Sequence, residues 1–206
     1  MKTYSTLLLF ILLGIFTSCQ QNNDPNTLPP TPNDYYITFE LDGTPMEFRT
    51  TSPQVSVSNG SGSGFRGVSC DIIPNVFSTP RETITINIDM QKDSIVYSDL
   101  KALEGQTLNV CQQRGTSACN YPIAVTLSYD KDTELWGTYA DNNPAGVQGI
   151  TITSVEPSDN VSLTGNKLAD ITGEFNLVLD VFNNGTTTLQ TASNGKFRLL
   201  FTENRD

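Results

Sequence analysis

The stretch Thr83-Ile84-Thr85-Ile86-Asn87-Ile88-Asp89-Met90 alternates polar and apolar side chains without a break. Successive side chains of a β-strand point to opposite faces of the sheet, so the isoleucines and the methionine fall on one face and the polar residues on the other. A helix does not fit, because its apolar face repeats every three to four residues. The stretch therefore predicts a strand with one buried face.

The same alternation continues on both sides of this stretch. Tyr35 to Leu41 alternates, Asp42-Gly43 is a strong hairpin signal, and Met46 and Phe48 continue beyond it. Further alternating segments lie at 55–57, 125–127, 135–139, 150–153, 175–181 and 196–201. Asn183-Asn184-Gly185 and Asn194-Gly195 each predict a turn before the strand that follows.

About ten strands joined by turns rich in Gly, Asn, Asp and Pro predict an all-β chain. We expect an antiparallel β-sandwich, with a lipocalin-like β-barrel as the alternative. Only Ser98 to Leu103 is helical in pattern, with Ser98 as its cap and Gly105 as its stop, so at most one short helix is expected.

The charge balance excludes several classes of function. The chain of 206 residues has a formal net charge of −10 and no histidine. Histidine-dependent catalysis and histidine metal sites are therefore ruled out. An acidic surface also argues against a nucleic-acid partner, because phosphates attract basic patches.

The first residues have the organisation of a signal peptide. Lys2 precedes an apolar run from Leu7 to Phe16, which is too short to span a bilayer. Phe16-Thr17-Ser18-Cys19 resembles the bacterial lipobox, which implies cleavage before Cys19 and acylation of its sulfur and amino group. A secretory peptide with a chance cysteine, or an uncleaved anchor, are the alternatives.

The chain is therefore expected to have three parts. Residues 1–18 are the signal peptide, 19–34 are the lipidated cysteine and a polar, proline-rich tether, and 35–206 are the β-sandwich domain. In the lipoproteins that this start resembles, an aspartate directly after the cysteine retains many members at the inner membrane. Gln20 stands there instead, which favours the outer membrane and leaves periplasmic and surface exposure open.

Four short motifs resemble the small uncharacterised lipoproteins common in Bacteroidota. They are Phe39 to Gly43, Gly149 to Thr153, Ile171 to Phe175 and Asn194 to Phe197. The resemblance implies a β-sandwich of unknown activity and supplies no catalytic residues. Asp93-Ser94-Ile95 also resembles the O-glycosylation motif of Bacteroidota envelope proteins, which makes Ser94 a candidate acceptor.

Three cysteines remain once Cys19 is lipidated. Because the envelope outside the inner membrane is oxidising, a disulfide is expected. Cys111 and Cys119 enclose a short loop and are the leading pair, and Cys70 bonded to either of them is the alternative.

Ring-bearing side chains gather in one part of the sequence. Tyr121, Tyr129, Trp136 and Tyr139 lie within nineteen positions and are candidates for a platform that stacks on sugars. The alternative is that the lone tryptophan belongs to the core.

Other candidate chemistry is weaker. The acids Asp130, Asp132 and Glu134 lie between two strands, where hairpin tips are commonly acidic, and no metal or cofactor is expected. Gly62, Gly64 and Gly67 match a dinucleotide spacing, but a strand rather than a helix follows.

The sequence predicts a lipid-anchored envelope module without catalytic activity, which contacts the membrane through its anchor and binds a glycan, a peptide or a partner protein. A small hydrolase with a carboxylate pair and a structural envelope subunit are the alternatives.

Overall fold

The computed structural model describes residues 34–59, 65–111, 121–139, 148–162 and 165–205. They belong to one compact unit, Asn33–Asp206. The strands in these ranges are β1 (Tyr35–Leu41), β2 (Thr44–Thr50), β3 (Gln54–Asn59), β4 (Arg66–Ile72), β5 (Thr83–Met90), β6 (Thr107–Val110), β7 (Ile123–Lys131), β8 (Glu134–Thr138), β9 (Gly149–Val161), β10 (Lys167–Asn183) and β11 (Thr186–Thr202), and the helix described among them is α2 (Tyr97–Lys101).

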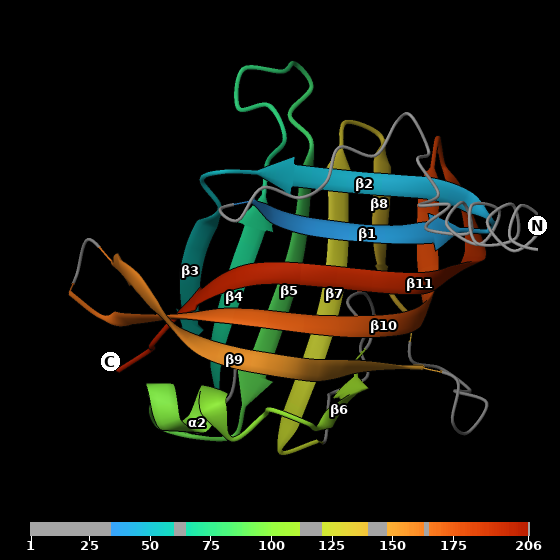
Figure 1. Ribbon diagram of the computed structural model, residues 1–206. Coiled ribbons are helices and arrows are strands. Elements are labelled where there is room, and N and C mark those ends of the chain that lie inside the picture. The colour runs from blue at the N-terminus through green and yellow to red at the C-terminus, as the bar shows by residue number, and fades with distance from the viewer. Residues whose placement is uncertain (1–33, 60–64, 112–120, 140–147, 163–164, 206) are drawn as a thin grey trace, which may run out of the picture. The chain divides into compact units, whose positions relative to one another are not determined.

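One continuous sheet folds over itself into two layers. Its strands follow the order β2-β1-β11-β10-β9-β6-β7-β5-β4-β3, and β8 pairs with both β10 and β7. In Figure 1, strands β2, β1, β11, β10 and β9 cross in front of β3, β4, β5, β7 and β8. Described pairings are antiparallel except that of β6 with β7. The all-β prediction is confirmed, and the single curved sheet has features of both a sandwich and a barrel.

Strand β5 has the two faces that its sequence predicts. Ile84, Ile86 and Ile88 are fully buried, whereas the intervening threonine and asparagine side chains are half-buried. These isoleucines belong to one large core between the layers. Burial of each contributes roughly 1.5–3 kcal/mol relative to exposure, which explains why this register is fixed.

The turn predicted at Asn194-Gly195 is wrong, because a bulge between β10 and β11 lies there instead. β11 continues through Asn194-Gly195, where Asn194 has a φ of 55° and the pairing with β10 shifts between Phe175 and Leu177. Gly195 lies against the Phe175 ring, which would be 2.3 Å from an added Cβ. Beyond this point β10 pairs with β8 instead of β9. The Asn-Gly pair therefore bends a continuous strand from one layer into the other.

The short helix also differs from the prediction at its start. Its N-cap is Val96, whose backbone N–H donates to the Asp99 carboxylate at 2.9 Å, and Ser98 lies inside the first turn. Gly105 has a φ of +79° just beyond the helix, as a stop requires. Within the described residues, no helix has the length and apolar character needed to cross a membrane.

Candidate functional site

The predicted aromatic platform is corrected by the burial of two of its rings. Trp136 is 2% exposed and Tyr129 is 4% exposed. Their rings stack with centroids 4.0 Å apart, and both contact the ring of Phe48. The indole N–H donates to the Glu134 carboxylate at 2.9 Å. The core alternative therefore holds for this pair, because the cross-strand neighbours β7 and β8 turn both rings inward.

The other two tyrosines do not join this pair. Tyr121 is 45% exposed and precedes β7. Tyr139 is half-buried after β8, and its backbone N–H donates to the Val178 carbonyl. The four residues do not form one shared surface, since Tyr129 and Trp136 lie in the core.

Of the two described cysteines, one forms a disulfide and the other is a free thiol. Cys111 is disulfide-bonded, and Cys70 is a free thiol in the core. Bonds from Cys70 to Cys111 or Cys119 are therefore excluded. The predicted partner Cys119 and the predicted lipidation site Cys19 both lie outside the described residues.

Ser94, the candidate acceptor for O-glycosylation, lies among the described residues. Ser94 is half-buried in the segment between β5 and α2, beside Ile95, which pairs with Asn204. Glycosylation of Ser94 stays a prediction. In the described part of the chain, no three Cys, Asp or Glu side chains are grouped as metal ligands would be.

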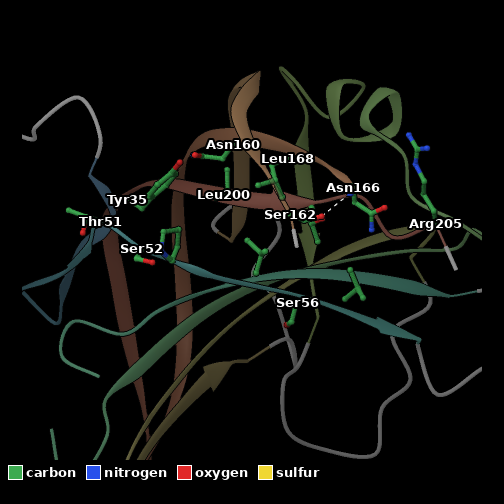
Figure 2. Close-up of a pocket in the computed structure, with 14 residues that line it drawn as sticks. Tyr35, Thr51, Ser52, Ser56, Asn160, Ser162, Asn166, Leu168, Leu200 and Arg205 are labelled. Carbon is green, nitrogen blue, oxygen red and sulfur yellow. Dashed lines mark hydrogen bonds between the residues drawn. The ribbon is translucent and has the colours of Figure 1, made fainter. Parts of the chain in front are cut away.

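A cleft lies where the front strands end against β3. It has a volume of about 870 Å³. Figure 2 shows side chains from the start of β1, the β2–β3 connection, the β9–β10 hairpin and the end of β11 around it. β3 pairs only with β4 in the described sheet and forms one wall. The lining residues are Tyr35, Thr51, Ser52, Pro53, Val55, Ser56, Val57, Asn160, Ser162, Asn166, Leu168, Leu200, Thr202 and Arg205.

The floor of the cleft is apolar. Tyr35, Leu168 and Leu200 form a small cluster apart from the main core, and Val55 packs against it. Val57, on the same strand, is 46% exposed. This floor offers an apolar surface to a ligand without opening the main core.

Tyr35 is held firmly at one end of this floor. The Arg198 guanidinium lies 5.5 Å from its ring centroid and contacts the Asp170 carboxylate at 3.2 Å. Burial, followed by the neighbouring Asp170 charge, raises the pKa of the Tyr35 phenol. The phenol is therefore neutral throughout the physiological range.

The rim of the cleft is polar and nearly uncharged. Its members carry hydroxyl or amide groups, and they are Thr51, Ser52, Ser56, Asn160, Ser162, Asn166 and Thr202. The backbone N–H of Asn166 donates to the Ser162 hydroxyl at 2.8 Å, which closes the β9–β10 hairpin beside the cleft (Figure 2). Among the lining residues that the structure describes there is no Asp or Glu.

Arg205 is the one charged residue in the described part of the lining, and it forms an ion pair. Arg205 Nη2 lies 2.8 Å from a carboxylate oxygen of Glu203, which is 1% exposed. Glu203 also accepts the backbone N–H groups of Tyr97 and Lys167. Burial alone would raise the pKa of Glu203, but the bonds from Arg205 and these two N–H groups outweigh it and lower the pKa. The cleft is therefore close to neutral in an acidic protein.

Sequence reasoning did not identify the cleft residues. Each segment is a polar stretch of common turn and strand residues, such as Thr50 to Ser58. A usable signal was the absence of charge from that stretch in a chain of net charge −10. These segments come together at β3 because the two layers of the sheet cross. The local alternation of polar and apolar residues does not predict that crossing.

Comparisons of the chain with protein-family models, with curated proteins and with solved structures give no match. The function must therefore be argued from the geometry of the chain itself.

Proposed function

We propose that this protein is a lipid-anchored, non-catalytic binding module of the cell envelope whose cleft at β3 takes a neutral oligosaccharide. The observation that carries the proposal is the lining of the cleft, where hydroxyl and amide side chains surround an apolar floor and no described lining residue carries a carboxylate.

The lining matches the chemistry of a neutral sugar. Ser and Thr hydroxyls and Asn amides both donate and accept hydrogen bonds, as sugar hydroxyls do. The C–H face of a sugar ring can cover the half-buried Val55 and the exposed Val57 and so remove apolar surface from water. The volume lies within the range of about 300–1,000 Å³ that is typical of small-ligand sites.

The same lining does not favour the hydrolase alternative. Glycoside hydrolysis commonly needs two carboxyl groups that flank the scissile bond. Burial raises the pKa of Asp89, against a smaller opposite effect of the Asn87 amide, but Asp89 lies on β5 and does not line the cleft. A binding function requires no such pair.

The proposed anchor suits a binding module. Fifteen residues, 20–34, separate Cys19 from the first strand, and fully extended they reach at most about 50 Å. A domain held within that distance of a membrane meets envelope glycans at a raised effective concentration.

Calorimetric titration tests the neutrality of the ligand. The full acylated chain in detergent is titrated with cello-, malto- and chito-oligosaccharides and with anionic oligogalacturonate. We expect binding of a neutral member, and Arg205→Gln should change its affinity by no more than about twofold. Binding of oligogalacturonate alone, lost in Arg205→Gln, would contradict a neutral ligand, and absence of heat from the whole panel would contradict a glycan site.

A second candidate ligand is an extended peptide. One long side of β3 has no strand partner in the described sheet and lies along the cleft, so a peptide strand could pair with it. Binding of unrelated extended peptides in the same titration, with no response to any oligosaccharide, would favour this candidate.

A further inference from the structure

The loop between β4 and β5 exposes two neighbouring apolar side chains, Val76 and Phe77. Phe77 is 91% exposed and Val76 is 54% exposed. Such exposure is unfavourable in water, because an aromatic ring gains free energy when it is covered. Their position at the tip of a loop makes them available for contact with a partner.

The loop is ordered by its own hydrogen bonds. The Asn75 side chain accepts the Phe77 backbone N–H at 3.0 Å, and the Asn75 carbonyl accepts the Ser78 N–H at 3.1 Å and its hydroxyl at 2.8 Å. Asn75 thus sets the turn that leaves Val76 and Phe77 at its tip. Figure 1 shows the loop projecting beyond the ends of β4 and β5.

The tip of the loop is uncharged, whereas Asp71, Arg81 and Glu82 flank the loop and Asp130 pairs with the neighbouring Thr83. From Ile72 to Pro80 the loop has no charged residue, and the next residue is Arg81. The chain as a whole carries −10. This loop is therefore a place where an acidic protein can approach a lipid headgroup layer without repulsion from the loop itself.

The loop projects from the end of the domain at which β1 begins. β1 and β4 are in contact, and in Figure 1 the end of β4 lies beside the start of β1. Asp170 acts electrostatically on both Tyr35, the first residue of β1, and Cys70, near the end of β4. A chain tethered through Cys19 therefore has this loop at its attached end.

We infer that Val76 and Phe77 insert into the interface of the bilayer to which the chain is anchored. The inference rests on the proposed anchoring at Cys19. The tether limits the distance between domain and bilayer, and the apolar tip then fixes which end of the domain faces the lipid. The cleft is oriented as a consequence of this second contact.

Lipid-quenched fluorescence tests the contact. The full acylated chain is placed in vesicles of phosphatidylethanolamine and phosphatidylglycerol whose acyl chains carry bromine near the headgroup. Trp136 is buried and gives the background. Phe77→Trp adds a reporter at the tip, and Tyr121→Trp is the matched control, because Tyr121 is 45% exposed and precedes Ile123, which pairs with Met90 at the opposite end of β5.

We expect quenching of the added tryptophan in Phe77→Trp and none in Tyr121→Trp. Equal quenching in both variants, or none in either, would overturn the inference. Protection of the Phe77→Trp reporter in native envelopes but not in protein-free vesicles would also overturn it, because the partner would then be a protein.

Failure of the anchor is recognised separately. The mass of the fragment that contains Cys19 reports acylation, and oligosaccharide titration of the same sample reports the cleft. If Cys19 is not acylated, free chain is added to the same brominated vesicles, where quenching of Phe77→Trp still supports insertion and its absence overturns it.

Discussion

Trp136 and Tyr129 stack in the core with an interplanar angle of 23° and a centroid separation of 4.0 Å. We expect Trp136→Ala to lower the free energy of unfolding by about 3–5 kcal/mol, as is usual for loss of a buried aromatic ring. Tyr121→Ala, at a ring that is 45% exposed, is the control and should cost no more than about 0.5 kcal/mol. Urea unfolding measures both, and equal small losses would contradict a core role for Trp136.

Gly195 permits the close approach of the Phe175 ring at the bulge. An added Cβ would lie 2.3 Å from that ring, so Gly195→Ala should cost about 1–3 kcal/mol through overpacking. In a Phe175→Leu background the same substitution should cost less, because the smaller side chain relieves the clash. A cost that is identical in both backgrounds in urea unfolding would show that the ring is not the cause.

Glu203 makes stability depend on pH in a defined direction. Its folded-state pKa is lowered, so its contribution is complete above the unfolded value of about 4.3 and is lost as the pH falls through the folded value. Glu203→Gln should cost about 2 kcal/mol at pH 7. The gap between wild type and variant should shrink below about pH 4. A gap that stays constant in urea titrations from pH 7 to pH 2.5 would refute the assignment.

The thiol of Cys70 should be inert in the folded protein. Its side chain is fully buried, and burial raises its pKa to about 12. Since the thiolate is the reactive form, iodoacetamide at pH 8 should modify Cys70 only after unfolding. Mass spectrometry of the Cys70 peptide after native and denaturing alkylation measures this, and rapid native labelling would be the contrary outcome.

The strands were predictable wherever one face is buried. In β5 and at the Asp42-Gly43 hairpin, burial and turn chemistry act locally, and the structure follows them. Asn194-Gly195 has the same local signal as a hairpin, but the strand continues there because Phe175 fills the space above the glycine. That contact depends on the partner strand and is not visible in the local sequence.

The site was less predictable than the fold. The alternation along the strand places Trp136 and Thr138 on the same face. It does not show whether that face points into the core or toward solvent. The cleft unites Tyr35, Val57, Leu200 and Arg205, which lie far apart in the chain. Only the crossing of the two layers brings them together.

The most direct test of the proposed binding site compares two tryptophan substitutions by calorimetry with the neutral oligosaccharide that binds wild type best. Val57→Trp fills the cleft, whereas Leu189→Trp makes a similar change at an exposed apolar side chain that does not line it. The account predicts a loss of roughly tenfold or more in affinity for Val57→Trp and a change within about twofold for Leu189→Trp. Wild-type affinity in Val57→Trp, with both variants folded, would contradict the assignment of the cleft as the binding site.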